Sequence, residues 1–451
     1  MCQPKLLTRS PRGNITPPPS KSMAHRAILC AALARGQSVI SNVALSQDVQ
    51  ATLSCVRALG AAWAVEGTTL TIKGGLGLMR GASEGAVSRT GAAFGVTGSV
   101  RSAQSVPWGS ALDAKNFPIS DVLDCGESGS TLRFLLPIAA MVCAGAETVF
   151  TGHGRLLNRP LGPYQTVFSQ SRIRLTRAGG RLVLRGQLRA DEYHLPGDVS
   201  SQFVSGLLFA LPLARGDSRL VLDTPLESAG YVDMTVAALG AFGVKIHRRD
   251  NGFDIPGGQM YRPTRVAVDS DYSQAAFFLG AAALGAPIRC LALNPESLQG
   301  DRAILEILRQ MGAEVRTEQG VTTVEATRLH ALTVDARAIP DLVPPIAALC
   351  CFCRGTSHII NAGRLRLKES DRLHALACEL GRLGADITEG PEALHITGKP
   401  TLEGGSVQAH NDHRIAMALA LAAMRCKNAV SLTGWESVGK SYPNFWRDWE
   451  G

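Results

Sequence analysis

Almost wholly apolar runs recur along the chain, and each follows a short stretch of polar, hydroxylic or cationic residues. The first copy opens with residues 19–22 (PSKS) and continues into an apolar run with no polar face. Such a run predicts a helix that is buried on all sides. The free N–H groups of its first turn, capped by Ser20 and flanked by Lys21 and Arg26, predict an anion site.

The arrangement returns five more times at a nearly constant spacing. The interval is about 70 residues, except that the first is longer by about 37, an excess that we interpret as a Gly- and Ser-rich surface loop at about 80–115. Behind each buried run the order is strand, polar loop, amphipathic helix and one or two strands. Six copies of one unit predict an α/β repeat fold. The later copies begin at Ser128, Ser200, Ser270, Pro340 and Asn411.

Six units divide naturally into two groups of three. The strand-like segment near the N-terminus, KLLTR, has no helix before it, and the sixth unit lacks its closing strands. The N-terminal segment is therefore expected to complete the C-terminal half. We predict one domain from residues 21–268 and a second from 1–20 with 269–451, with crossings near 19–21 and 267–270.

Composition narrows the function. The 451 residues are 45% hydrophobic and include 47 glycines, which suits a compact α/β protein. The net charge of +8 is spread along the chain, which favours small anionic ligands over nucleic acid. Eleven cysteines, several of them in apolar runs, suit reduced core residues, and we interpret the Cys350 and Cys353 pair as core rather than a metal site. With no signal-peptide pattern and no membrane-length apolar run, we predict a cytoplasmic protein and no membrane partner.

Charged and hydroxyl groups gather at one end of every unit, after a strand or at a helix start. Open α/β folds bind ligands at that end. Several arginines and lysines there require several phosphate or carboxylate groups, because each charge-assisted hydrogen bond contributes roughly 1.5 to 3 kcal/mol. The sequence therefore predicts small, multiply anionic ligands. The residues are Lys21, Ser22, Arg26, Arg133, Arg159, Ser200, Ser201, Gln202, Asp341, Lys368, Glu369, Arg372, His413, Arg414 and Lys440.

Seven short motifs stand in one order along nearly the whole chain. They are 19–22 with 26–27 (PSKS and RA), 157–161 (LNRPL), 197–203 (GDVSSQF), 231–235 (YVDMT), 368–372 (KESDR), 411–414 (NDHR) and 439–443 (GKSYP). Together they resemble the signatures of the 5-enolpyruvylshikimate-3-phosphate synthase family. The resemblance implies an inverse α/β barrel fold of two domains, each of three βαβαββ units, whose buried parallel helices point at a cleft. It also implies enolpyruvyl transfer from phosphoenolpyruvate to the 5-hydroxyl of shikimate 3-phosphate, with no metal or cofactor, in aromatic amino acid biosynthesis.

The resemblance assigns a role to each candidate residue. Asp341 is similar to the base that takes the hydroxyl proton, Glu369 to the acid that protonates the methylene carbon, and Lys21 to an acid for the departing phosphate. The implied shikimate 3-phosphate residues are Lys21, Ser22, Arg26, Ser200, Ser201, Gln202, Ser228, Tyr231, Asp341 and Lys368. The implied phosphoenolpyruvate residues are Lys21, Gly129, Arg133, Arg159, Gln202, Arg372, Arg414 and Lys440.

Two positions depart from the family pattern. Glu127 places a carboxylate beside the expected phosphate site, so we expect it to point away or to pair with a cation such as Lys21 or Arg133. Arg364 stands where an asparagine often contacts the shikimate phosphate, and no contact is carried over to it. Gly129 is retained where alanine would crowd glyphosate, which makes glyphosate an expected inhibitor of undetermined potency. A monomer is expected.

Other classes of protein stay open as alternatives. The enolpyruvyl transferase that acts on UDP-N-acetylglucosamine shares the fold but opens with Ala-Lys-Asn and uses a loop cysteine, whereas Cys125 here precedes a helix of the other branch. RNA 3′-phosphate cyclases would need a nucleophilic histidine and a nucleotide site, and we identify neither. A structural repeat protein would not place cations and paired carboxylates at one end of every unit.

Each candidate also has a purely structural interpretation. Ser128, Ser200 and Ser201 are good helix caps, and Asp341 is a good helix-opening residue. Asp371 and Arg372 are typical of a surface pair, and His413 beside Asp412 is typical of a satisfied structural histidine, which we rank behind the proton carriers. The constellation, rather than any single residue, carries the functional interpretation.

Overall fold

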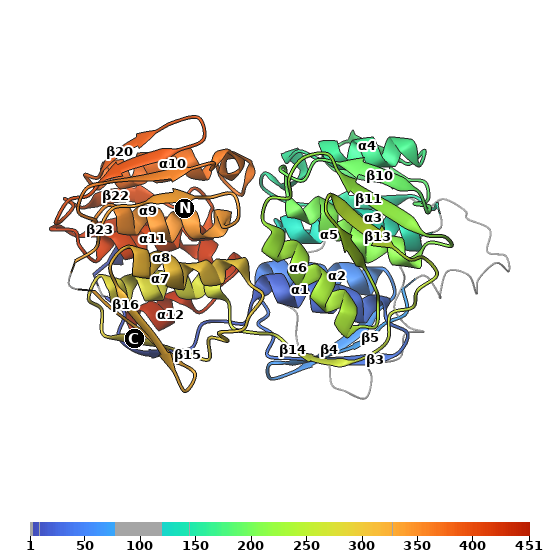
Figure 1. The fold of residues 1–451 in the computed structure, drawn as a ribbon, viewed down its shortest axis with the longest axis horizontal. Helices are drawn as coiled ribbons and strands as arrows, with labels where there is room; N and C mark the ends of the chain where they lie inside the picture. The colour runs from blue at the N-terminus through green and yellow to red at the C-terminus, as the bar shows by residue number, and fades with distance from the viewer. Residues whose placement is uncertain (1–2, 9, 77–119, 144, 327) are drawn as a thin grey trace.

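The chain forms two lobes that are joined along one side (Figure 1). This is a computed structural model, and it describes residues 3–8, 10–76, 120–143, 145–326 and 328–451. The predicted surface loop at about 80–115 lies outside the described residues. Each lobe packs around its own hydrophobic core.

Each lobe contains three repeated units, as predicted; within the described residues five of the six units have a four-stranded sheet, and the last has a three-stranded sheet that includes the N-terminal strand. In the first lobe, the three sheets have the strand orders β14-β3-β5-β4, β6-β7-β9-β8 and β10-β11-β13-β12. The elements are α1 (Lys21–Leu33), β3 (Gln37–Ser41), α2 (Gln47–Ala58), β4 (Ala62–Glu66), β5 (Thr69–Lys73), β6 (Val122–Asp124), α3 (Gly129–Val142), β7 (Thr148–Thr151), α4 (Gly162–Gln170), β8 (Arg174–Ala178), β9 (Arg181–Arg185), β10 (Glu192–Leu195), α5 (Ser201–Ala210), β11 (Ser218–Leu222), α6 (Ala229–Ala241), β12 (His247–Arg249), β13 (Gly252–Ile255) and β14 (Arg265–Ala267).

The second lobe repeats this plan. Its sheets have the strand orders β16-β17-β15-β2, β18-β19-β21-β20 and β1-β23-β22. The elements are β1 (Lys5–Leu7), β2 (Gly13–Ile15), α7 (Tyr272–Ala283), β15 (Ile288–Leu291), α8 (Ile304–Gln310), β16 (Glu314–Glu318), β17 (Val321–Glu325), β18 (Thr333–Asp335), α9 (Val343–Cys350), β19 (Thr356–Ile360), α10 (Arg372–Arg382), β20 (Asp386–Glu389), β21 (Leu394–Thr397), β22 (Gly405–Gln408), α11 (His413–Ala423), β23 (Val430–Thr433) and α12 (Phe445–Glu450).

The first strands of the chain complete the sheets of the second lobe. β1 pairs antiparallel with β23, and β2 pairs parallel with β15, while β14 returns to pair parallel with β3. The two crossing segments touch through a bridge between Pro19 and Ser270. The exact domain boundaries at 20/21 and 268/269 stay a prediction.

The buried helices α3 and α5 pack closely because Gly206 has no side chain and Pro137 has no N–H at their contact. Pro137 in α3 has no N–H, so the carbonyl of Arg133, four residues earlier, is free to accept a hydrogen bond from Tyr164 Oη at 2.7 Å. A Cβ on Gly206 of α5 would lie 2.0 Å from the same Oη, so only glycine fits there. This contact fixes α3 against α5 and positions the residues at their N-terminal ends.

Candidate active site

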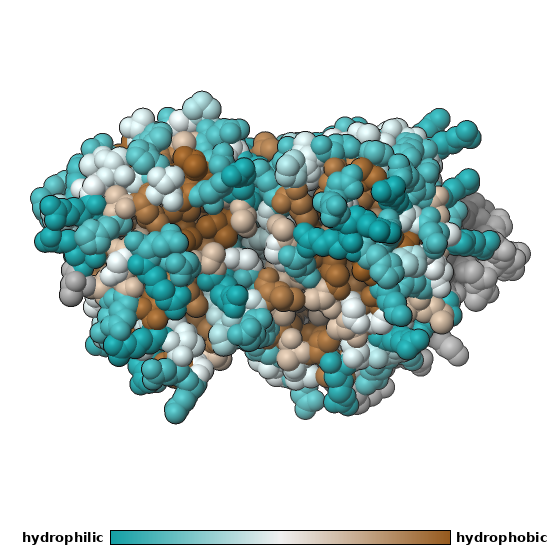
Figure 2. Space-filling view, viewed as in Figure 1, coloured by the Kyte–Doolittle hydropathy of each residue, from teal (hydrophilic) through white to brown (hydrophobic). Residues whose placement is uncertain are grey.

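One cleft between the lobes is lined by the first residues of the buried helices of both lobes. Figure 2 shows the molecular outline narrowing where the lobes meet. The cleft encloses about 1060 Å³ of space that is continuous with solvent. Helix N-termini carry partial positive charge, which adds to the side-chain cations. Every predicted binding or catalytic residue except Lys440 lines this cleft.

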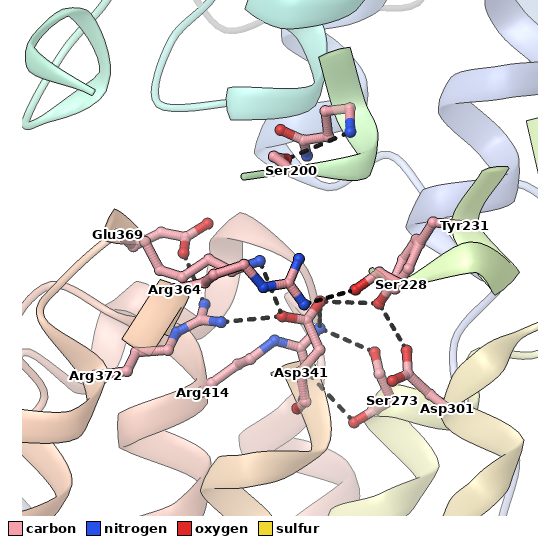
Figure 3. A network of polar contacts seen from close by, with 12 residues as sticks. Ser200, Ser228, Tyr231, Ser273, Asp301, Asp341, Arg364, Glu369, Arg372 and Arg414 are labelled. Carbon is pink, nitrogen blue, oxygen red and sulfur yellow. Dashed lines mark hydrogen bonds and ion pairs between the residues drawn. The ribbon is translucent and has the colours of Figure 1, made fainter. Parts of the chain in front are cut away.

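Asp341 lies in the short helix η6 (Pro340–Leu342) and contacts cations from several elements (Figure 3). Its Oδ1 accepts a hydrogen bond from Arg372 Nη1 at 3.0 Å, and its Oδ2 accepts one from Arg414 Nη2 at 3.1 Å. Lys368 Nζ lies 3.7 Å from Oδ1. Burial alone would raise the pKa of Asp341, but Arg414, Lys368 and Arg372 together hold it well below its usual value. The carboxylate is therefore ionised.

Glu369 is the second carboxylate of the cleft and contacts both lobes. Its Oε2 accepts a hydrogen bond from Arg372 Nη2 at 2.7 Å, and its Oε1 lies 3.7 Å from Arg159 Nη2 of the first lobe. Burial alone would raise its pKa, but Arg372 and Arg159 lower that pKa well below the usual value. Arg372 is 1% exposed and also donates Nε–H to Asp412 Oδ2 at 2.8 Å. One guanidinium thus holds three carboxylates, the third being Asp341.

Two cations stand at the starts of α1 and α3. Lys21 Nζ donates to Asp48 Oδ2 at 2.7 Å. Gly129, the first residue of α3, lies so close to Arg159 that a Cβ at this position would be 2.6 Å from Nη1. Free helix N–H groups and two cations form a corner suited to a phosphate group.

A second contact ties α3 to α5 at the same corner. Arg133 Nη1 donates to Gln202 Oε1 at 2.8 Å, and Gln202 Nε2 donates to Ser130 Oγ at 2.9 Å. Burial, with a contribution from Arg159, lowers the pKa of Arg133 to about 10. The guanidinium remains a cation at neutral pH, and its fork faces the cleft wall made by these two helices.

Arg26 occupies the first-lobe wall of the cleft. Its Nε donates to Thr235 Oγ1 at 2.8 Å, and its two terminal nitrogens donate to the carbonyls of Ser22 and Tyr231, each at 2.7 Å. Burial lowers its pKa to about 10. A buried guanidinium whose present partners are mostly neutral oxygens is a good site for an incoming carboxylate.

The start of α6, in the first lobe, contacts the second lobe (Figure 3). Tyr231 Oη lies 2.8 Å from Asp301 Oδ2 and 3.1 Å from Asp341 Oδ2, so its single proton is shared between the two carboxylates. Burial and the neighbouring Asp341 raise the pKa of Asp301 to about 7. Ser228, before α6, has a φ of 54°, and its N–H and Oγ–H both donate to the carbonyl of Arg337 at 3.2 Å. A left-handed backbone is unusual for serine, and such strain clusters at functional sites.

Serine side chains were predicted to cap α1, α3 and α5, and they do so at α3 and α5. Ser128 Oγ accepts from Thr131 N at 3.2 Å, and Ser200 Oγ accepts from Gln202 N at 3.3 Å. Capping does not remove Ser200 from the cleft, which it also lines. The predicted cap by Ser20 is wrong, since its side chain makes no cap hydrogen bond.

Two structural interpretations of single residues are also wrong. Asp371 does not pair with Arg372 on the surface but caps α10 and pairs with Arg366 at 3.1 Å. His413 is buried in the cleft wall, and within the described residues its ring nitrogens have no hydrogen-bond partner, with Nδ1 3.9 Å from Asp412 Oδ1. Burial lowers the pKa of His413 well below its usual value, so the ring is neutral.

Glu127 pairs with a cation, but not with either cation that we expected. Its Oε2 accepts from Lys440 Nζ at 2.7 Å, and its carboxylate also accepts from the side-chain amide of Asn411. Lys21 and Arg133 have other partners. Glu127 thus joins the two lobes beside the cleft. It neutralises Lys440, the predicted binding residue that does not line the cleft.

Several residues of the site escaped the sequence prediction, and three of them are charged groups with clear partners or a place in the cleft. Asp48 pairs with Lys21, Asp301 accepts from a cleft tyrosine, and Arg364 lines the cleft itself. Asp48 and Asp301 both stand near a helix start after a strand. The rule that selected the other candidates, polar groups at that end of a unit, would have found them too.

The described ranges contain no group of three or more His, Cys, Asp or Glu residues placed to hold a metal ion. None of the helices in those ranges is long and apolar enough to cross a membrane. Cys350 and Cys353 are free thiols and are both buried in the hydrophobic core of the second lobe.

Two lobes of three units each, with cations and paired carboxylates meeting between them, define a two-lobed α/β protein whose cleft is suited to small anionic ligands. Comparison with known proteins gives the family. The model of EPSP synthase (3-phosphoshikimate 1-carboxyvinyltransferase) matches residues 8–106 and 93–449. The chain belongs to the EPSP synthase family.

Individual relatives and solved structures agree with this assignment. The 3-phosphoshikimate 1-carboxyvinyltransferase of Clostridium novyi is 41% identical over 449 residues, which cover 99% of this chain and 96% of the relative. The 3-phosphoshikimate 1-carboxyvinyltransferase of Clostridium kluyveri is also 41% identical, over a match that covers 97% of this chain and 94% of the relative. The structure of EPSP synthase from Acinetobacter baumannii aligns with a TM-score of 0.73 and 26% identity, covering 99% of this chain and 97% of that one.

Proposed function

We propose that the cleft binds shikimate 3-phosphate and phosphoenolpyruvate together and transfers the enolpyruvyl group to the 5-hydroxyl, releasing phosphate. The observation that carries this proposal is the meeting of five cations from both lobes around two carboxylates. The five are Lys21, Arg133, Arg159, Arg372 and Arg414. The surplus of positive charge favours small anionic substrates, and the two carboxylates supply the proton transfers that the reaction requires.

Shikimate 3-phosphate occupies the side of the cleft nearer α5 and α6. Ser22 and Arg26 bind its carboxylate, and Tyr231 packs beside its ring. Lys368 and Asp341 hold the ring hydroxyls, while Lys21 and Gln202 border both substrates. The hydroxyls of Ser200, Ser201 and Ser228 surround its 3-phosphate. The serines that line the cleft at helix starts and the buried guanidinium of Arg26 support this placement.

Phosphoenolpyruvate occupies the side nearer α3 and α11. Arg372 and Arg414 clamp its carboxylate, a task for which the planar guanidinium fork is suited. Lys21, Gly129, Arg133, Arg159, Gln202 and Lys440 bind its phosphate. The nearness of Gly129 to Arg159 supports this placement, because it brings backbone N–H groups and a guanidinium to the same phosphate. Lys440 joins only if it leaves Glu127.

Substrate binding prepares the acid and the base. Before binding, Arg372 holds both Asp341 and Glu369, and both pKa values lie below their usual range. The carboxylate of phosphoenolpyruvate takes Arg372 and Arg414 as its own partners. Asp341 and Glu369 then lose part of their cationic surroundings, and their pKa values rise, which makes one a better base and lets the other carry a proton.

The reaction then proceeds by addition and elimination. Asp341 removes the proton of the 5-hydroxyl, whose oxygen attacks C2 of phosphoenolpyruvate, while Glu369 gives a proton to C3. In the tetrahedral intermediate a methyl proton returns to Glu369, the double bond reforms, and the C2–O bond to phosphate breaks. Lys21 protonates the departing phosphate. Arginines and helix N–H groups stabilise the charge that builds on phosphate and carboxylate.

The proposal is tested by phosphate release from phosphoenolpyruvate with each acceptor in turn. Shikimate 3-phosphate is expected to support turnover, and UDP-N-acetylglucosamine is expected to give only the rate without acceptor. Turnover with the nucleotide sugar alone would overturn the assignment. A monomer, a cytoplasmic location, inhibition by glyphosate and the domain boundaries at 20/21 and 268/269 stay predictions.

A further inference from the structure

Asp301 is a buried carboxyl group near the base that the reaction scheme above does not use (Figure 3). It lies in the short helix η5 (Gly300–Ala303) of the second lobe and is 4% exposed. Among the described residues its side chain accepts one hydrogen bond, from Tyr231 Oη at 2.8 Å, and its Oδ1 has no partner. A buried carboxyl group with so little support is unusual and calls for an explanation.

Two glycines bring the Tyr231 hydroxyl to Asp301 across the boundary between the lobes. Gly230 precedes the tyrosine in α6, and Gly300 precedes the aspartate in η5. A Cβ on Gly230 would lie 3.2 Å from both the Cα and the backbone N of Gly300, which is closer than most side chains pack. The close contact of the two backbones therefore places the hydroxyl against the carboxyl group.

The same hydroxyl also contacts the base. Tyr231 Oη lies 3.1 Å from Asp341 Oδ2, and a phenol has a single proton to donate, so the two carboxyl groups compete for it. When Asp301 is ionised, its shorter contact takes this hydrogen bond and Asp341 has one donor fewer. When Asp301 is protonated, its own O–H donates to the phenol oxygen, and the tyrosine proton turns to Asp341.

The groups around Asp301 place its change of charge near neutral pH. Burial raises the pKa of Asp301 to about 7, and the carboxylates of Asp341 and Asp271 act in the same direction. Arg414 and the hydrogen bond from Tyr231 act against them. The base itself stays ionised over this range, because three cations hold its pKa low against the effect of burial. The direction of the tyrosine proton therefore follows the charge of Asp301.

We propose that Asp301 is a positioning residue for the base: it accepts the hydrogen bond of Tyr231 and so leaves Asp341 free to take the proton of the 5-hydroxyl. The inference rests on the proposed function and adds to it a second carboxylate that acts through the tyrosine. A carboxylate that loses a hydrogen-bond donor becomes a stronger base. The tyrosine keeps its proton, and Asp341 receives the substrate proton as in the scheme above.

A comparison of wild type with D301N across pH separates this role from a structural one. Asparagine has the shape of aspartic acid and is neutral at every pH, so D301N corresponds to protonated Asp301. Asp301 is ionised above its raised pKa of about 7 and loses its charge as the pH falls through that value. The ratio of wild-type to D301N kcat/KM for shikimate 3-phosphate is therefore expected to be about tenfold at pH 8 and less than about twofold at pH 5.5. The difference is expected in kcat, with KM changed less than about twofold.

Two further variants show whether the effect passes through the tyrosine. Y231F keeps the ring and removes the hydroxyl, so adding D301N to Y231F is expected to change kcat/KM less than about threefold at pH 8. The matched control is D448N, which makes the same change at another tyrosine–aspartate pair of the second lobe, where Tyr442 Oη donates to Asp448 Oδ2 at 2.9 Å. The ratio of wild type to D448N is expected to stay near one at both pH values.

The outcomes distinguish this inference from the proposed function. If wild type turns over the two substrates but the D301N ratio is the same at both pH values, or D301N changes only KM, the inference alone is wrong. An equal effect of D301N with and without the Tyr231 hydroxyl also contradicts it. If wild type gives no turnover with the two substrates, the proposed function is wrong and the inference falls with it.

Discussion

Replacing Arg372 by glutamine tests the view that one buried guanidinium holds the acid, the base and a structural carboxylate. Glutamine is neutral and shorter, so Asp412, which is fully buried, and Glu369 lose their main cation. Breaking a buried ion pair on one side costs about 3–5 kcal/mol. For a domain of about 150–250 residues each kcal/mol lowers the melting temperature by about 2–4 °C, so we expect a loss of about 6–20 °C.

The stability lost in R372Q is expected to depend on pH. In wild type Arg372 lowers the folded-state pKa of Asp412 and Glu369 against the effect of burial, so this stabilisation is complete above the unfolded pKa of about 4 and is lost only as the pH falls through lower values. In R372Q burial raises both pKa values. The two carboxylates then take up protons at a higher pH than in wild type, so the gap to wild type is smaller at pH 5 than at pH 7.5.

Thermal unfolding by circular dichroism at pH 5 and pH 7.5 measures both effects. The matched control is R337Q, which removes a guanidinium from an exposed pair with Asp335 and is expected to change the melting temperature far less than R372Q does. A loss for R372Q no larger than that of the control, or one of equal size at both pH values, would refute the reasoning.

Three further predictions concern steady-state kinetics. G129A places a methyl group 2.6 Å from Arg159 Nη1 and displaces it, so the KM for phosphoenolpyruvate should rise about tenfold while that for shikimate 3-phosphate stays within about twofold; equal changes would argue against the phosphate corner. R26A should raise the KM for shikimate 3-phosphate by about tenfold more than that for phosphoenolpyruvate, and the reverse order would contradict the division of the cleft. Burial lowers the pKa of Lys368 to about 8, so wild-type kcat/KM for shikimate 3-phosphate should fall above that pH as the lysine loses its charge. The K368M variant should lack this fall in kcat/KM at high pH. If the fall is unchanged in K368M, it belongs to another group.

The sequence was most informative about the repeated unit. The spacing of apolar runs predicted six buried helices, because a run with no polar face has no stable place at a surface. Counting strands at the two ends predicted that the N-terminal segment belongs with the C-terminal half, and the pairing of β1 with β23 follows that pattern. The start of α9 was less predictable, since Pro340 opens a short 3-10 helix before the α-helix begins at Val343.

The ion pairs between the lobes could not be predicted from the sequence. Motifs selected residues that line the cleft, because each unit presents the same end to it. They did not show which cation meets which carboxylate, since those partners come from units far apart in the chain. Glu127 was expected near Lys21 or Arg133 and pairs with Lys440 instead, and the pairing of Arg364 with Glu227 had no sequence signal.

Phosphorus NMR of one reaction mixture tests the central claim most directly. Wild type with shikimate 3-phosphate and phosphoenolpyruvate is expected to convert the phosphoenolpyruvate signal into inorganic phosphate, with a matching shift of the retained 3-phosphate signal. D341N, which cannot take the hydroxyl proton, should slow this conversion by about 100-fold or more. Conversion by D341N within about tenfold of wild type would contradict the account of the base, and no conversion by wild type would contradict the account of the cleft.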